Sequence, residues 1–277
     1  MKIKKLLLRS PIYIGLGGAL IVMLYPTFWI FMSSFKADYE FYTYPPYALP
    51  KSFAIENYTN LLDTSIPLNF RNSLFIAVVT IVCVIILGML AAYPIAKMRF
   101  RGRSVIMNVI MAGIMIPGTA SLIPMYSIYN SIGLLNSPWA VIIPQCGFAI
   151  PVSMFLCIGF LNQLPDSVIE AAYIDGAGTL RIFTGIIIPM MRNVIITIAT
   201  FQFVFVWNEF VFARTFLLKP ELRTVPLGLM TFVTEHGRRS WGMTLAAICA
   251  TLLPTLIIFF FLNKQVMKGM AAGAVKQ

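Results

Sequence analysis

The chain has 277 residues, of which 59% are hydrophobic and only 11% are charged. That composition lies outside the range of soluble globular domains, so we predict an integral membrane protein. The formal net charge of +11 does not indicate nucleic-acid binding. The basic residues flank the apolar runs, where they anchor helices and meet anionic membrane lipid.

Charge-free apolar runs define the predicted transmembrane helices, because a helix needs about 20 apolar residues to cross the hydrocarbon core. Residues 104–165 carry no charge, and we divide this run at YNSIGLLNSP, 129–138, whose residue types are typical of turns. We predict an all-α protein with a cytoplasmic N-terminus at 1–10, a membrane domain over 11–263 and a cytoplasmic tail at 264–277. Six spans are expected at about 11–32, 72–96, 107–128, 139–161, 193–213 and 242–263.

The distribution of Lys and Arg predicts the orientation. The segments on the N-terminal side of the membrane hold 13 of the 21 basic residues, which favours a cytoplasmic N-terminus. An even number of spans then returns the C-terminus to the cytoplasm. The opening MKIKKLLLRS also resembles a signal peptide, but the following apolar run is too long and lacks a cleavage site, so we expect an uncleaved anchor.

No residue pattern predicts a metal or nucleotide site. The four cysteines fall within apolar spans without metal-ligand spacing, and His236 is the only histidine, expected as a solvated surface residue. The chain has no G-x-x-x-x-G-K-[ST] phosphate-binding loop. We therefore expect a non-catalytic subunit that binds no cofactor itself.

One predicted cytoplasmic segment, 162–192, is unlike an ordinary loop. Ser167 and Glu170 have the spacing of a capping box, which would begin a short helix, and Gly176 should end it. A second helical stretch is expected from Thr179 toward Pro189. The small residues between these helices would let another surface approach the backbone closely, while Glu170 and an aspartate at 175 could meet donors.

This segment resembles the EAA loop of bacterial ABC importer permeases, in which EAA is followed by three residues, a glycine, nine residues and I-x-L-P. Here Ile188 stands at the position that usually holds leucine. The resemblance implies a coupling helix that sits in a groove of a separate cytoplasmic ATPase subunit. The alternative to a coupling helix is a capped helix that only connects two spans and binds no partner. The coupling residues implied by the resemblance are Glu170, Ala171, Ala172, Asp175, Gly176, Ala177, Ile186 and Pro189.

Further segments, including YPTFWIFMSSFK at 25–36, WNEF at 207–210 and RTVPLGL at 223–229, resemble the carbohydrate branch of these permeases, on the side of the smaller maltose-permease subunit. The resemblance implies the type I importer fold in a bacterial cell membrane. It also implies a second homologous permease, two ATPase subunits that bind ATP and Mg, an extracellular solute-binding protein and a carbohydrate substrate. The C-terminal tail is similar to a family tail that inserts between the ATPases, although Gln277 stands where glycine is common.

Two groups of residues are candidates for contacts outside the ATPase interface. Amides, carboxylates and aromatic faces recognise sugars, and the fifth span offers these residue types. Glu209 could instead be satisfied by Arg214 or water. The candidate substrate residues are Gln202, Trp207, Asn208 and Glu209.

In the maltose-type subunit the loop before the last span contacts the solute-binding protein. The residues expected to do so here are Glu235, His236, Gly237, Arg238, Arg239, Ser240 and Trp241.

Three other functions remain as alternatives. An ABC permease for a non-sugar solute would share the coupling segment. An ion-coupled secondary transporter would need ionisable residues at mid-span, and almost none occur there. A membrane enzyme would need a cluster of catalytic side chains, which the sequence does not contain.

Overall fold

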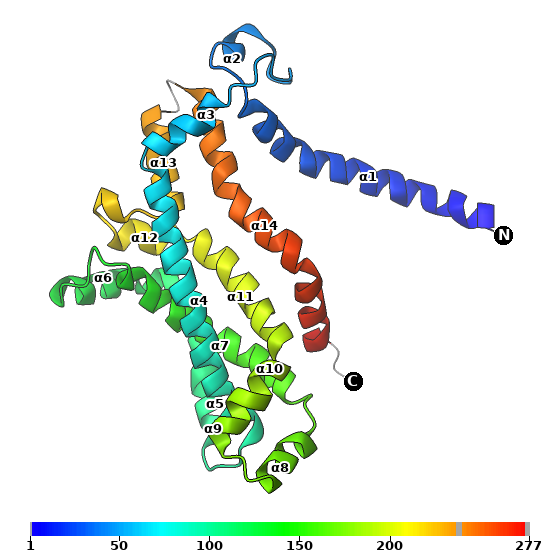
Figure 1. Ribbon diagram of the computed structural model, residues 1–277, viewed down its shortest axis with the longest axis vertical. Coiled ribbons are helices and arrows are strands. Elements are labelled where there is room, and N and C mark those ends of the chain that lie inside the picture. The colour runs from blue at the N-terminus through cyan, green and yellow to red at the C-terminus, as the bar shows by residue number, and fades with distance from the viewer. Residues whose placement is uncertain (1, 237–239, 275–277) are drawn as a thin grey trace. The chain divides into compact units, whose positions relative to one another are not determined.

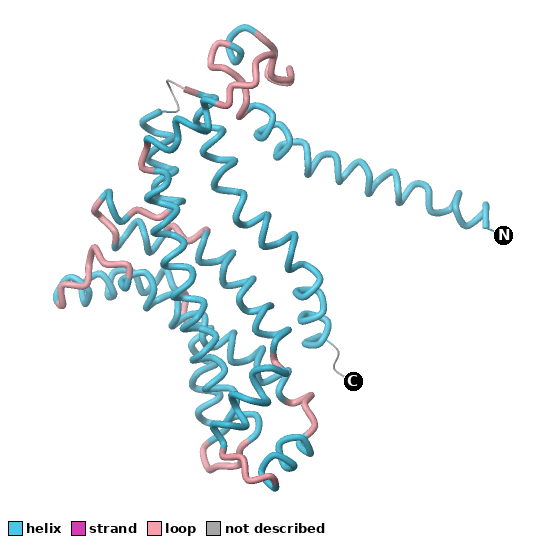
Figure 2. Tube along the Cα trace, in the orientation of Figure 1, coloured by secondary structure: helices cyan, strands magenta, loops and turns pink. Residues whose placement is uncertain are grey.

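The computed structural model describes residues 2–236 and 240–274, with side chains for 12–236 and 240–262. Within those ranges every regular element is helical, which confirms the predicted all-α fold (Figures 1 and 2). Short 3₁₀ turns and one π-helical segment, Phe183–Ile187, connect some of the helices. The α-helices are α1 Lys2–Ser33, α2 Glu40–Thr43, α3 Glu56–Thr59, α4 Ile66–Lys97, α5 Arg103–Ala112, α6 Leu122–Ser131, α7 Trp139–Leu161, α8 Asp166–Ile174, α9 Thr179–Ile182, α10 Ile188–Met190, α11 Arg192–Trp207, α12 Val211–Phe216, α13 Val225–His236 and α14 Trp241–Ala274.

Four described helices are long and apolar enough to cross a membrane: Ile12–Ser33, Ile66–Lys97, Trp139–Leu161 and Trp241–Leu262. Two sharply bent helix pairs also qualify, so up to six spans result if each bent pair is one span. Several helix ends differ from those expected, including the start of α1, at Lys2 rather than 11. α4 begins at Ile66 rather than 72, α11 ends at Trp207 rather than 213, and α14 continues through the expected tail to Ala274.

The expected third span is not a straight helix. Arg103–Met115 and Gly118–Ser131 meet at 86°. Ile116 has φ −84° and ψ 113°, the extended conformation that a following proline imposes, so the helix stops before Pro117. A Cβ added at Gly118 would lie 3.4 Å from the rings of both Phe148 and Phe212, so the chain after the break runs close to these two aromatic side chains.

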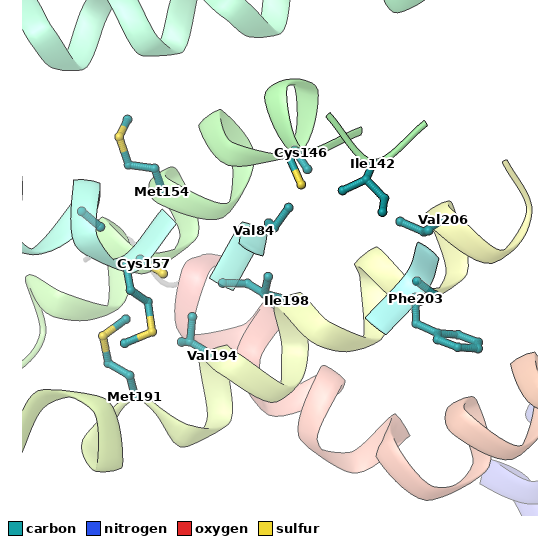
Figure 3. Close-up of a cluster of buried hydrophobic side chains, with 14 of the residues drawn as sticks. Val84, Ile142, Cys146, Met154, Cys157, Met191, Val194, Ile198, Phe203 and Val206 are labelled. Carbon is teal, nitrogen blue, oxygen red and sulfur yellow. The ribbon is translucent and has the colours of Figure 1, made fainter. Parts of the chain in front are cut away.

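The chain divides into two compact units, 1–67 with 229–253, and 68–228 with 254–277. The core of the second unit is formed by α4, α7 and α11, whose buried side chains meet in Figure 3. α4 approaches α7 closely at Gly88, where an added Cβ would lie 2.5 Å from Oγ of Ser153. Small residues favour such packing in membranes, because lipid is as apolar as the helices and close contact supplies the attraction.

The first unit is stabilised by buried polar groups in the connection after α1. The Nδ2 of Asn57 donates to the carbonyls of Ser34 and Lys36, each at 2.9 Å. The amide of Gly242 donates to Oδ1 of Asp38 at 3.0 Å, which ties this connection to the start of α14. Satisfying these groups internally matters because an unpaired buried polar group costs about 1–3 kcal/mol.

The carboxylate of Glu40 organises the same connection. It accepts hydrogen bonds from the amides of Lys51 at 2.7 Å and Ser52 at 3.1 Å, and from the Ser52 hydroxyl. Burial alone raises the pKa of Glu40, but these hydrogen bonds to its charged form outweigh burial and leave the pKa below its ordinary value. Glu40 is therefore a structural carboxylate that holds the chain around it.

Candidate functional site

α8 is the first half of the segment singled out by the sequence. It begins directly after Pro165, whose ψ of 130° lies outside the helical range, and Asp166 places a negative charge in the first turn. No side-chain cap forms at this end. The predicted capping box of Ser167 and Glu170 is therefore wrong. The start of the helix is held from another element instead.

Lys97, at the end of α4, holds the start of α8. Its Nζ donates to the carbonyl of Leu164 at 2.8 Å and forms an ion pair with the carboxylate of Asp166. The ammonium group lowers the pKa of Asp166 by its hydrogen bond and its charge. The sequence analysis did not assign Lys97 or Asp166 to the site. Only the basic run KMRFRGR at 97–103 pointed to this end of the span.

The end of α8 is closed by a Schellman motif at Gly176. This residue has a positive φ of 78°, and its amide donates to the carbonyl of Tyr173 at 3.0 Å. The amide of Ala177 donates to the carbonyl of Ala172 at 2.9 Å. These two bonds satisfy carbonyls that the helix end would leave free, and the left-handed conformation favours glycine. The motif glycine thus has a backbone role, and the predicted end of the helix is confirmed.

The outward face of α8 carries both small and apolar residues. Ala172 and Ile169 are buried against the unit, whereas Glu170, Ala171, Asp175 and Gly176 are exposed. The side chain of Ile174 is 86% exposed, and Leu180, just beyond the turn, is 73% exposed. The motif thus exposes backbone, carboxylates and the apolar side chains of Ile174 and Leu180. The sequence analysis did not assign these two residues to the site.

The second half of the segment is helical, as predicted, and its buried side chains anchor α8 to the core. α9 begins at Thr179, and Ile182 and Ile187 have no exposed surface. Phe183 packs on Tyr93 of α4 with 5.3 Å between ring centroids. Ile186 is half-buried against the core. In Figure 1, α8, α9 and α10 lie at the same end of this unit as α5.

Pro189 lies at the bend that follows. It has no N–H to continue the helical ladder, and the preceding residues 183–187 form a wide π-helical turn. The stretch Thr179–Met190 meets α11 at 72°. The EAA motif therefore ends just before α11, which together with Thr179–Met190 makes one of the two bent pairs that could span a membrane, so α8 is connected to α11 through continuous backbone.

The four candidate substrate residues do not converge on one site. Gln202 lines a largely apolar groove of about 200 Å³ between α7 and α11, beside Phe201 and Phe205. Trp207 instead is 3% exposed and packs between Phe70 and Phe203. Its place in the core follows from packing, because an aromatic ring of this size buries a large area and stacks on neighbouring rings.

Asn208 and Glu209 lie in the turn after α11. The Nδ2 of Asn208 donates to the carbonyl of Val204 at 2.7 Å. The carboxylate of Glu209 accepts from the amides of Phe212 at 2.6 Å and Ala213 at 3.0 Å, in the first turn of α12. Glu209 therefore caps a helix, and backbone amides satisfy it, which differs both from the predicted substrate contact and from the alternative of Arg214 or water.

The predicted binding-protein contact lies between α13 and α14. Gly237, Arg238 and Arg239 fall outside the described residues. Glu235 is exposed, Ser240 donates its amide to the carbonyl of residue 236 at 2.9 Å, and Trp241, at the start of α14, is 45% exposed.

His236 differs from its expected solvated state. It is half-buried, with its ring stacked 4.4 Å from that of Phe232, one turn earlier on α13. This i, i+4 pairing is the spacing at which side chains meet on a helix.

The sequence is similar to a known protein family and to several known transport proteins. Residues 84–266 match the family described as the binding-protein-dependent transport system inner membrane component. The chain is 32% identical over 268 residues to the probable ABC transporter permease protein YurM of Bacillus subtilis, covering 97% of this chain and 89% of that relative. It is 29% identical over 276 residues to the trehalose/maltose transport system permease protein MalG of Thermococcus litoralis, covering 99% of each.

A solved structure shows the same fold. It is the crystal structure of a bacterial ABC transporter involved in the import of the acidic polysaccharide alginate, matched with a TM-score of 0.83 and 23% identity over 94% of this chain and 97% of that chain. The overall fold of this chain is thus a known one. Together with the sequence matches, these findings show that the chain belongs to the family of binding-protein-dependent transport system inner membrane components.

Proposed function

We propose that this chain is the permease subunit of an ATP-driven carbohydrate importer, and that α8 is the helix through which a separate ATPase acts on it. The observation that carries the proposal is the outward face of α8. Exposed Ile174 and Leu180 lie within the EAA motif on either side of Gly176, which keeps the backbone accessible. A partner seated on α8 would cover these two apolar side chains, and removal of apolar surface from water favours association.

The carbohydrate assignment rests on the trehalose/maltose relative, which aligns with nearly the whole chain. A substrate of this class needs hydrogen-bonding groups and apolar faces along the pathway. Gln202 is the candidate contact that the geometry supports best, since it faces a groove beside two phenylalanines. Asn208 is exposed and is a second candidate. Trp207 and Glu209 act in the proposed mechanism as supports for α11 and α12.

The remaining partners follow from the same proposal. A second homologous permease completes the pathway, two ATPase subunits bind ATP and Mg below the membrane, and a solute-binding protein delivers the sugar from outside. In this arrangement both termini and α8 lie on the cytoplasmic side. ATP-driven closure of the ATPases moves α8, and the bend at Pro189 passes that movement to α11. The turn between α13 and α14, including Glu235 and Trp241, meets the solute-binding protein.

The test is co-purification from the native host. Ile174→Glu places a charge on the exposed face of α8 without straining the backbone, and we expect it to lose the ATPase while retaining the second permease. Leu62→Glu is the matched control, because Leu62 is 72% exposed but lies far along the chain from α8. It should retain both partners.

Uptake of radiolabelled maltose by cells that carry each variant gives the second readout. We expect loss of uptake with Ile174→Glu and normal uptake with Leu62→Glu. A wild-type chain that purifies without any ATPase would refute the importer function. A wild-type complex with an ATPase but without uptake of maltose or trehalose would direct the search to another solute.

A further inference from the structure

α4 is attached at its C-terminal end to the start of α8. Lys97 lies in the last turn of α4, and its side chain is only 7% exposed. Its ammonium group donates to the carbonyl of Leu164 and pairs with Asp166, so it bridges two successive points of the chain that leads into α8. The charge is held by one ionic and one backbone acceptor, which fixes α8 relative to α4 more firmly than a single surface ion pair would.

The opposite end of α4 is attached to the segment that precedes and begins α13. Nδ2 of Asn72 donates to the carbonyls of Glu221 at 2.8 Å and Arg223 at 3.1 Å. One residue further, the hydroxyl of Ser73 accepts from the amide of Val225 at 2.8 Å. Ser73 is buried, so loss of this acceptor would leave a buried amide unpaired.

A close backbone approach strengthens this second attachment. Asn69 is one turn before Ser73, and it has no exposed surface. An added Cβ at Gly228 would overlap the side chain of Asn69, so α13 can pack this closely only because residue 228 is glycine. The hydrogen bonds of Asn72 and Ser73, and the close packing of residue 228 on Asn69, thus hold the segment 221–228 against one face of α4.

α4 itself is suited to carry movement between these attachments. It is one helix of 32 residues, about 48 Å long at 1.5 Å per residue. Ala77, Val84 and Ala92 on its packed face have no exposed surface. A closely packed helix moves as a body because its interior contacts cannot be stretched without loss. Pro94 lies inside α4 one turn before Lys97, so the packed stretch from Asn72 to Ala92 is the part that moves as a body, and the last turn links it to Lys97.

We infer that α4 transmits movement of α8 to the segment 221–228, with Lys97, Asn72 and Ser73 as positioning residues. This inference rests on the proposed function, because an ATPase must move α8. It assigns a role to contacts that lie outside the EAA motif. In this arrangement the ATPase controls two helices at once, α11 through continuous backbone and α4 through the Lys97 contact.

The experiment follows the segment 221–228 while the ATPase changes state. A Glu221→Cys reporter, in a Cys83→Ala background, is labelled with a membrane-impermeant maleimide in the purified complex. Glu221 is exposed, and its contact to Asn72 is through its backbone carbonyl and not its side chain. We expect the labelling rate to differ between the nucleotide-free complex and the complex trapped with ATP, Mg and vanadate.

Variants at each end of α4 then test transmission. Asn72→Leu and Lys97→Met should reduce the nucleotide-dependent change in labelling about fivefold or more, the size of a typical coupling between sites. Lys97→Arg retains the donors and should restore most of the response. Arg101→Met, which removes a charge from the exposed turn after α4, and Ser131→Ala, at an exposed helix end, are controls that should respond like the reporter parent.

Each outcome separates this inference from the proposed function. Asn72 is at the far end of α4 from α8, so the Asn72→Leu complex should keep its ATPase. If that complex holds its ATPase and responds to nucleotide as the parent does, transmission through α4 is refuted and the importer function stands. The same conclusion follows if the parent holds its ATPase and shows no nucleotide response. If the parent purifies without an ATPase, both proposals fail.

Discussion

The amide of Ala177 donates to the carbonyl of Ala172 at 2.9 Å, and Gly176 between them has a φ of 78°. This closing hydrogen bond joins the second alanine of EAA to the residue after the motif glycine, and so spans Gly176 at the end of α8. The spacing between EAA and its glycine is the spacing that a Schellman motif needs to end a helix. The shape of the proposed coupling surface therefore has a local backbone cause.

The backbone at Gly176 gives the first prediction. Gly176→Ala should lower stability by about 1–2 kcal/mol, because an L-residue is disfavoured in the left-handed conformation. Nothing lies within 4 Å of an added Cβ, so the effect is conformational and not steric. Thermal unfolding of the purified complex measures it, together with ATPase retention.

Gly178 is the matched control for this change. Its φ is −71°, and an added Cβ there also meets nothing within 4 Å. Gly178→Ala should cost less than Gly176→Ala, because its φ is allowed and only the preference for glycine over alanine at the N-cap of α9 is lost. Gly176→Asn should cost less than Gly176→Ala because asparagine tolerates the left-handed region. Equal losses at 176 and 178 would contradict the Schellman explanation.

Glu209 gives a second prediction, which separates a cap from a substrate contact. Glu209→Ala removes acceptors from the amides of Phe212 and Ala213 and should destabilise the protein by about 1 kcal/mol. The measurement is the unfolding temperature in detergent, paired with sugar uptake. Glu221→Ala, on an exposed side chain, is the control and should change neither. A loss of uptake at unchanged stability would instead make Glu209 a pathway residue.

Trp207 and Gln202 should respond in opposite ways. Trp207→Ala should cost about 3–5 kcal/mol, because it leaves a cavity between Phe70 and Phe203. Gln202→Ala should preserve stability and reduce the apparent affinity for the transported sugar, because Gln202 lines the groove. Denaturant unfolding and concentration-dependent uptake distinguish the two effects. A stable Trp207→Ala protein with altered uptake would overturn the core assignment.

Glu40 gives a prediction about pH. Glu40→Gln replaces an acceptor oxygen by a donor group that faces backbone amides, which should cost about 1–3 kcal/mol near neutral pH. Because the folded pKa of Glu40 is lowered, its contribution is present above the ordinary carboxyl pKa and is lost as pH falls through the lowered value.

The pH dependence of unfolding tests that sign. The stability difference between the wild type and Glu40→Gln should stay constant from neutral pH down to about pH 5 and narrow at lower pH, as the wild-type carboxyl gains its proton. Glu56→Gln is the control on an exposed side chain of the same connection and should show little difference at any pH. A difference that grows on acidification would refute the lowered pKa.

The sequence by itself determined the class of protein and the place of the coupling segment. Both depend on local patterns: long charge-free runs require a membrane, and the EAA spacing out to Pro189 follows neighbouring residues along one stretch of chain. The end of α8 at Gly176 was predictable for the same reason. A left-handed residue after a helix is a local event, and glycine signals it.

Tertiary structure alone decided how those elements are held. The residue that fixes the start of α8 is Lys97, which no spacing rule connects to Asp166, and the predicted local capping box does not form. Trp207 and Glu209 have residue types suited to sugar binding, but packing placed one in the core and a nearby helix end satisfied the other. Residue type is written in the sequence, whereas the partner of a side chain depends on which distant segments the fold brings within about 3 Å of it.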